Sequence, residues 1–171
     1  MSAACGASSA SDAGDVGAAS SSPAPSAAIK ATEAFVALAK GTGSATVPWG
    51  EHVAYYIGGV RVADLKPEDF PAALQSCPPG KAEYEGRACP VSPLATVASM
   101  VNDGADVVVE PNAPTLLGCT NVTMPKEASA LAAATVRPLE KDRNCFSDFA
   151  VTLFTDATGN VQTIQFTLDG P

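Results

Sequence analysis

The sequence predicts an α+β domain: a small antiparallel β-sheet built from hairpins, with two or three helices and two disulfide bridges. Three observations support this. Two segments consist of paired alternating runs around a turn, other segments have helical periodicity with capping residues, and an even number of cysteines remains once the one nearest the N-terminus is set aside. The chain has 171 residues, enough for one ordinary domain with a core.

Three segments have helical character. Residues 29–40 (IKATEAFVALAK) place apolar side chains on one side, and Gly41 follows as a stop signal. Residues 67–75 begin with Pro, Glu and Asp, which are favoured at helix starts. Residues 93–102 begin with a proline directly after Ser92, which can cap the helix.

The first hairpin is expected over residues 52–65 (HVAYYIGGVRVADL), because Gly58-Gly59 suits a tight two-residue turn. Such a turn pairs Ile57 with Val60 and Tyr55 with Val62. It puts Tyr56 and Arg61 opposite each other on the outside of the sheet. The residues expected on the core face are Val53, Tyr55, Ile57, Val60 and Val62.

The remaining strands are expected over residues 106–110, over residues 131–137 and in a hairpin spanning residues 149–170, with its turn at residues 156–160. The two arms of this last hairpin alternate clearly between apolar and polar side chains. The residues expected on its core face are Phe149, Val151, Leu153, Ile164, Phe166 and Leu168.

The N-terminal residues 1–28 differ from residues 29–171, which are expected to form the single folded domain. Of these 28 residues, 18 are Ala or Ser and none is basic. A segment with so few large apolar side chains cannot offset the entropy of ordering it, so a disordered tether is expected.

Cys5 is the candidate for lipid attachment. The residues around it, Ser2-Ala3-Ala4-Cys5-Gly6, resemble a bacterial lipobox, with small residues before the cysteine and a glycine after it. The leucine usual three places before the cysteine is replaced by Ser2, and no basic and apolar signal segment precedes it. A lipid on Cys5 would anchor the domain to the outer side of the cell membrane.

The other four cysteines are expected to form two disulfides in an extracytoplasmic compartment: Cys77, Cys89, Cys119 and Cys145. Four cysteines permit three pairings. Cys77–Cys89 would close a loop containing Pro78-Pro79-Gly80, which leaves Cys119–Cys145.

Composition argues against several function classes. The chain carries 10 Lys+Arg against 18 Asp+Glu, a net charge of −8, which disfavours nucleic-acid binding. The single histidine, His52, disfavours a multi-histidine metal site, and no cofactor motif or nucleophile motif is present. The carboxylate pairs Glu83/Glu85 and Asp103/Asp106 are interpreted as solvated charges. A small site around Trp49, His52 and Tyr56 stays open.

Most of residues 29–171 resembles an uncharacterised family of small secreted actinobacterial lipoproteins. The shared features are FVALAKG, VPWGEHVAYYIGGVRVADL, a Ser-Pro-Leu helix start, a Gly-Cys loop and a closing VRP…NCFSDFAVTLFTDATGNVQTIQFTLDGP. The resemblance places Cys119 and Cys145 at the family's cysteine positions, which implies that they pair. It implies no known activity.

A second resemblance is to the subtilisin-inhibitor family of streptomycetes. A Pro/Gly-rich cysteine loop precedes a helix, and Cys119-Thr120-Asn121-Val122-Thr123-Met124-Pro125 is similar to the protease-binding loop at Cys119, Val122 and Pro125. This resemblance implies that Asn121 occupies the specificity position. Thr123-Met124 stands where the family has Tyr-Asp, and the family's later Trp-Gly segment is missing.

These observations favour a non-enzymatic, lipid-anchored extracytoplasmic binding or envelope-interaction domain, monomeric and without cofactor or metal, whose ligand the sequence does not identify. The alternative is a disulfide-braced serine-protease inhibitor.

Overall fold

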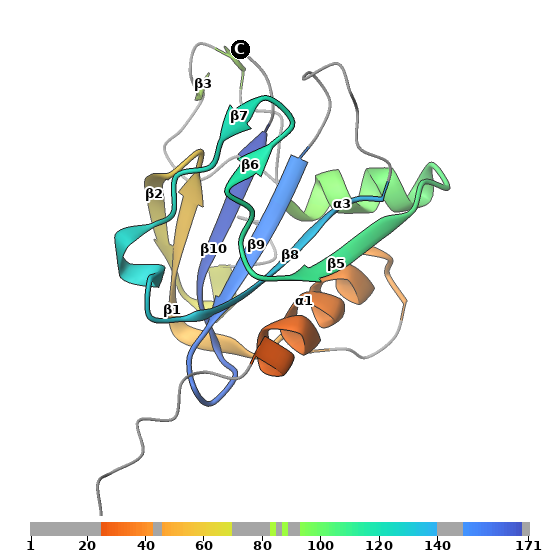
Figure 1. Cartoon of the computed structure of the whole chain (residues 1–171). Coiled ribbons are helices and arrows are strands. Elements are labelled where there is room, and N and C mark those ends of the chain that lie inside the picture. Colours follow the sequence, from red (N-terminus) through yellow and green to blue (C-terminus); the bar gives the residue numbers. More distant parts are fainter. Residues whose placement is uncertain are drawn as a thin grey trace, which may run out of the picture.

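The computed structural model describes residues 25–42, 46–69, 83–84, 87–88, 93–139 and 149–168. Within these residues the fold is α+β, with a mixed six-stranded sheet and two α-helices (Figure 1). The helices are α1 (Pro25–Ala39) and α3 (Pro93–Asn102), with 3-10 turns η1 (Pro67–Asp69) and η2 (Lys126–Ala128). The sheet strands are β1 (Trp49–Ile57), β2 (Val60–Leu65), β5 (Val107–Pro111), β8 (Ala132–Pro138), β9 (Phe149–Thr155) and β10 (Val161–Leu168). Two-residue strands form the pairs β3 (Glu83–Tyr84) with β4 (Arg87–Ala88) and β6 (Leu116–Leu117) with β7 (Thr120–Asn121).

The expectation of a purely antiparallel sheet is wrong. The strand order is β2-β1-β10-β9-β8-β5, and β1 runs parallel to β10 while the other neighbours are antiparallel. The N-terminal hairpin and the C-terminal strands therefore belong to one sheet. The β1–β10 pairing joins them, and it brings together residues more than 100 positions apart in the sequence. Alternation within each strand carries no information about this neighbour.

The first hairpin has the expected turn but a different register. Ile57 pairs with Val60 across Gly58-Gly59, whereas Tyr55 pairs with Ala63 because a bulge lies between the Tyr55 and Tyr56 pairings. Val60 is 53% exposed and is not part of the core. The bulge lies in the edge hairpin of the sheet, where such irregularities disfavour pairing with another chain.

The helices cover one face of the sheet and bury the main core. Phe35 of α1 is fully buried and meets the Trp49 ring edge-on, with the ring centroids 6.5 Å apart. The expected core residues of β9 and β10 all point to this face, with Leu168 only partly buried. The α1 helix packs against β5, β8 and β9, and α3 lies beside α1.

The other elements agree with the sequence except at their ends. Helix α3 and strands β5 and β8 lie where expected to within one residue. Helix α1 begins at Pro25, so the last four residues counted with the tether are helical, and Ala28 is fully buried. Of the helix expected at residues 67–75, only the 3-10 turn Pro67–Asp69 lies within the described residues.

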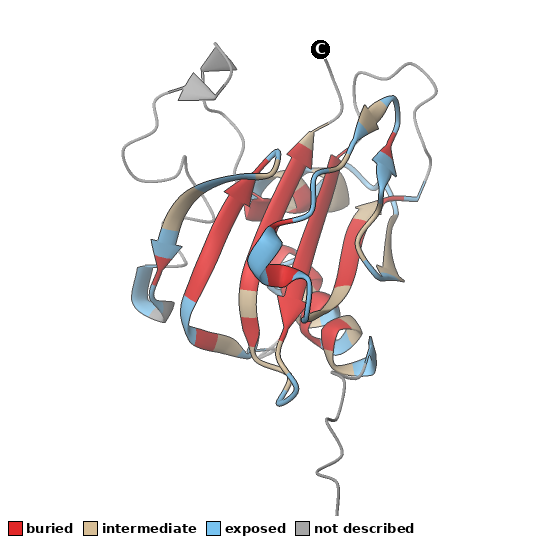
Figure 2. Ribbon diagram, turned by 60° about the vertical axis from the view of Figure 1, so that its left-hand side comes forward, coloured by how far each residue is buried: buried red, intermediate tan, exposed pale blue. Residues whose placement is uncertain are grey.

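The face of the sheet opposite the helices lies under a long connection between β5 and β8. These two strands are antiparallel neighbours, which a turn of about two to five residues can join. Residues 112–131 join them instead, and Figure 2 shows this segment in front of the central strands. We call residues 112–131 the cover. It includes β6, β7 and η2, and it buries Leu117, Pro125 and Ala128.

Candidate functional site: a groove beside the cover

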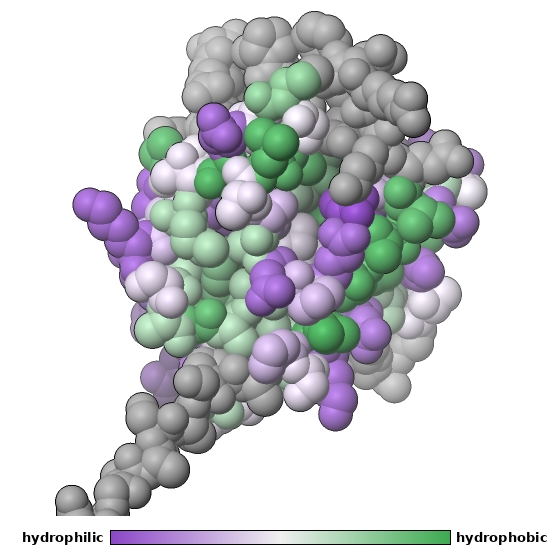
Figure 3. All heavy atoms as spheres, in the orientation of Figure 1, coloured by the Kyte–Doolittle hydropathy of each residue, from purple (hydrophilic) through white to green (hydrophobic). Residues whose placement is uncertain are grey.

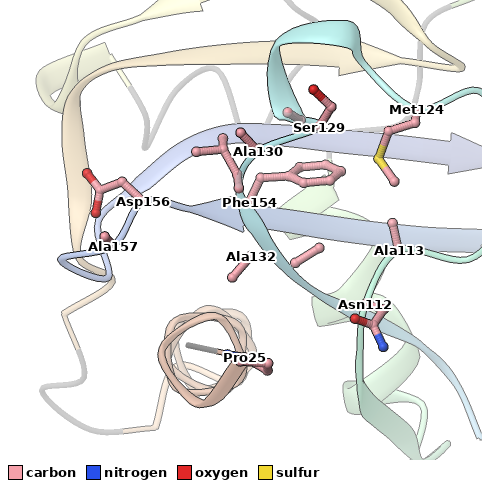
Figure 4. A pocket seen from close by; sticks show the side chains of 13 residues that line it. Pro25, Asn112, Ala113, Met124, Ser129, Ala130, Ala132, Phe154, Asp156 and Ala157 are labelled. Atoms are coloured by element: carbon pink, nitrogen blue, oxygen red, sulfur yellow. The ribbon is translucent and has the colours of Figure 1, made fainter. Parts of the chain in front are cut away.

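A groove of about 770 Å³ opens between the cover, the sheet and the start of α1. Figure 4 shows the Phe154 ring at its centre, with Met124 and Ser129 of the cover on one side. Asp156 and Ala157, from the β9–β10 turn, lie at one end. Among the described residues, the lining consists of Pro25, Asn112, Ala113, Met124, Ala128, Ser129, Ala130, Leu131, Ala132, Ala133, Phe154, Asp156 and Ala157.

Small side chains create this space. Residues 130–134 read Ala-Leu-Ala-Ala-Ala, which carries the chain from the cover into β8. Ala133 pairs with Phe154, so a methyl group and a buried aromatic ring stand side by side on the floor. Larger side chains at positions 132 and 133, the half-buried alanines of β8, would occupy the volume now open, whereas Ala130 is exposed. The groove is therefore shaped for an apolar or small-residue surface rather than for a charged group.

The polar residues of the groove are fixed by the fold. The carboxylate of Asp156 accepts hydrogen bonds from Thr158, from the Asn160 backbone and from Gln162 at 2.6 to 3.0 Å. Desolvation alone would raise the pKa of Asp156, but these hydrogen bonds lower it below its ordinary value. Asp156 is therefore ionised at neutral pH and holds the β9–β10 turn.

Asn112 forms the opposite end and marks where the cover leaves the sheet. Its φ is +71°, a left-handed conformation that asparagine tolerates better than most residues. Its backbone N–H donates to the Ala133 carbonyl at 2.8 Å, and its own carbonyl accepts from the Thr135 hydroxyl at 2.9 Å. This geometry turns the chain out of β5 beside the groove.

A row of polar side chains crosses the sheet beneath the cover. Each of the six strands contributes one residue to this row, and each residue pairs with the next in the order Arg61, Tyr56, Gln165, Thr152, Thr135 and Glu110. We call these six residues the polar row. The four central members of the row are buried, although threonine and glutamine side chains are usually exposed in folded proteins.

The cover is attached to the polar row by hydrogen bonds. Gln165 Nε2 donates to the Thr123 carbonyl at 3.1 Å, and Thr135 Oγ1 donates to the Asn112 carbonyl at 2.9 Å. Within the row, Thr135 Oγ1 lies 2.8 Å from Thr152 Oγ1. The Gln165 side-chain oxygen is buried and has no hydrogen-bond partner among the described residues.

Glu127 provides a further attachment. It accepts a hydrogen bond from the Tyr56 hydroxyl and lies 3.6 Å from Arg61. Burial and the Glu127 carboxylate together raise the pKa of Tyr56 to about 12, against the opposing charge of Arg61. Tyr56 was expected on the outside of the sheet, and alternation did place it on the face away from the core. The cover, which the sequence did not predict, is what buries it.

The residues singled out from the sequence do not come together at this groove. Trp49 packs against α1, Tyr56 lies on the opposite face, and His52 is exposed on β1, so these three do not form one site. Asp103 and Asp106 are exposed, and the side chains of Glu83 and Glu85 lie outside the described residues. Within the described ranges there is no group of three potential metal-ligating side chains.

Of the cysteines expected to carry a lipid or to form disulfides, Cys119 alone lies within the described residues. Cys119 is disulfide-bonded and lies in the turn between β6 and β7. The other four, Cys5, Cys77, Cys89 and Cys145, lie outside the described residues, and so does the partner of Cys119. Both pairings therefore stay predictions.

Two further findings concern membrane-spanning helices and similarity to known proteins. In the part of the chain that the structure describes, no helix is long and apolar enough to span a membrane. No protein-family model, curated protein or solved structure compared with the chain matches it.

Proposed function

We propose that the chain is a non-enzymatic binding domain, held outside the cell by a lipid on Cys5, and that the groove beside the cover takes its partner. The observation that carries this proposal is the lining of the groove: among the described residues it is mainly apolar, with six alanines in thirteen residues, and its carboxylate, Asp156, is already engaged by the β9–β10 turn. Such a lining offers contact area and shape rather than acid–base chemistry.

The anchor is proposed from the lipobox-like residues at Cys5 and the Ala/Ser-rich segment that follows. The bridges Cys77–Cys89 and Cys119–Cys145 belong to the same proposal, because disulfides persist in extracytoplasmic compartments. Mass spectrometry of the protein from its host is expected to find a diacylglyceryl group on Cys5, and a free thiol there would contradict the anchor. Peptide mapping without reduction checks the bridges, and a Cys77–Cys145 link would contradict the pairing.

The groove is tested by a photo-crosslinking amino acid in place of Ala130, which lines it. The control places the same group at Leu38, exposed on α1 and outside the lining. On the host's cells we expect a defined adduct from position 130 that position 38 does not give. Identical adducts at both positions, or none at position 130, would contradict binding at the groove.

The alternative, a serine-protease inhibitor, concerns residues 119–125. Asn121 and Met124 are exposed, while the Thr123 carbonyl accepts from Gln165 and Pro125 is buried against the sheet. The loop is thus partly held down on the domain rather than projecting along its whole length. Titration of subtilisin and trypsin with the purified protein decides the matter, because tight stoichiometric inhibition would replace our proposal.

A further inference from the structure

The length and attachment of the cover point to a movable element. Twenty residues join β5 to β8, although the strands are antiparallel neighbours. Connections of this length with little regular structure are uncommon in compact domains and often form lids or binding loops. Within the cover, β6 and β7 have two residues each and η2 has three.

The interface under the cover is much less apolar than the interface under the helices. The helix side buries aromatic and large aliphatic side chains such as Phe35, Leu153 and Ile164. On the cover side the sheet presents mainly threonine, alanine, Gln165 and Tyr56, with Phe154 the one large apolar residue among its buried members. Little apolar area therefore opposes separation of the cover from the sheet.

The polar contacts divide the cover into two halves. Residues 112–121 leave the sheet at Asn112, whose N–H and carbonyl are both hydrogen-bonded to β8, and they include the disulfide-bonded Cys119. Residues 122–131 form one wall of the groove. They are attached to the sheet by the Thr123 carbonyl and by Glu127, whose side chain is about half exposed and meets Arg61 at 3.6 Å.

The groove leaves room beside this second half. Met124, Ser129 and Ala130 are exposed beside the opening, with Met124 46% exposed, whereas Ala128 lies at its wall and is almost fully buried. Figure 3 shows apolar residues on this side of the molecule, over the cover, between hydrophilic residues at its edges. The second half of the cover is thus held by polar contacts at Thr123 and Glu127 and by the small buried side chains of Pro125 and Ala128, and it lies against open space along its groove side.

We propose that residues 122–131 are a lid that swings off the sheet while the rest of the fold stays intact, with Glu127 as its latch. Opening widens the groove into the polar row, exposing Gln165 and Thr152 together with the Phe154 floor. The inference deepens the proposed binding function by making the lid the element that admits the partner, but the motion itself is measurable without any partner.

The test uses thiol accessibility on the two faces of the sheet. Thr163→Cys places a thiol on the cover-side face, between Ala54 and Phe154, where Thr163 is 2% exposed. Val151→Cys places one on the helix side of β9, where Val151 is fully buried. Iodoacetamide is applied to the full chain under native conditions, and mass spectrometry reads the introduced thiol alone.

We expect Thr163→Cys to be labelled about tenfold or more faster than Val151→Cys, because local opening costs less than global unfolding. Adding Glu127→Ala should raise the Thr163→Cys rate about three- to tenfold and raise the Val151→Cys rate by no more than the same factor, because the Glu127 contacts are lost in both the open and the unfolded state. Glu33→Ala, at an exposed position of α1, is the matched control and should change neither rate.

Equal labelling of the two thiols would overturn the lid, since both would then report global unfolding. An unchanged Thr163→Cys rate in the Glu127→Ala variant would remove its role as a latch. Should Thr163→Cys fail to fold, Ala54→Cys provides a second buried thiol on the cover-side face, paired with Thr163. If the lid does not move, crosslinking from position 130 can still detect a partner in the groove. If no crosslink forms, the thiol labelling still reports the motion of the lid. The lid and the binding function can therefore be refuted separately.

Discussion

The Thr135–Thr152 pair at the centre of the polar row gives an asymmetric prediction. Each hydroxyl has one proton, and the Thr135 proton is donated to the Asn112 carbonyl at 2.9 Å. Thr152 must therefore donate to Thr135 across the 2.8 Å contact. Both threonines are almost fully buried, so water does not replace a lost partner.

Replacement by the isosteric valine separates the two roles. Thr152→Val removes one donor and leaves the Thr135 hydroxyl bonded to Asn112, so the free energy of unfolding should fall by about 1 kcal/mol. Thr135→Val leaves the buried Thr152 hydroxyl without an acceptor and also removes the donor to Asn112, which should cost about 2 to 3 kcal/mol. The double variant leaves no buried threonine hydroxyl without a partner. Its loss in the free energy of unfolding should therefore be smaller than the sum of the losses in the two single variants.

Urea unfolding followed by Trp49 fluorescence measures these differences, with an unchanged m-value as the sign that the two end states are the same. Thr115→Val, at an exposed cover position, is the control and should stay within about 0.5 kcal/mol of the parent. If Thr152→Val cost as much as Thr135→Val, or the two effects were additive, the donor–acceptor assignment would be refuted.

Three further changes have defined outcomes. Phe35→Ala removes the largest fully buried side chain of α1 and should cost about 3 to 5 kcal/mol in urea unfolding, so a loss under 1 kcal/mol would contradict its place in the core. Gly59→Ala should destabilise clearly more than Gly104→Ala. Both glycines have φ near +80°, but a Cβ at position 59 would lie 2.8 Å from Thr123 Cβ, whereas position 104 faces open space. The ionised Asp156 stabilises the fold above the ordinary carboxyl pKa, and this contribution is lost as the pH falls through its lowered value. Asp156→Asn should therefore flatten the dependence of the free energy of unfolding on pH in the acid range below the ordinary carboxyl pKa.

The sequence was sufficient for the elements whose pattern is local. The alternation in residues 149–155 and 161–168 identified both strands and their core faces, because a period of two is imposed by the backbone itself. Pro93 after Ser92 marked the start of α3, since proline fits the first turn of a helix.

The features that sequence reasoning missed depend on distant residues. The parallel pairing of β1 with β10 is a choice of neighbour, and the same alternating strands could equally stand at two sheet edges. The bulge that moves the partner of Tyr55 from Val62 to Ala63 changes register without altering the pattern of either strand. The one available signal for the cover was the long interval between two strands predicted at residues 106–110 and 131–137, interrupted by Pro and Gly.

The polar row explains why the groove lies on the cover side rather than among the helices. The helix face buries large aliphatic and aromatic side chains, whose exposure would remove most of the hydrophobic free energy that holds the fold together. The cover-side face instead buries hydroxyl and amide groups, and their hydrogen bonds to the cover can be exchanged for hydrogen bonds to water or to a partner at little net cost. The helix face of the sheet thus provides most of the stability, whereas the cover-side face carries the hydrogen bonds that can be exchanged. A binding surface can change on the cover side without loosening the Phe35-centred core that fixes β8 and β9 beneath it.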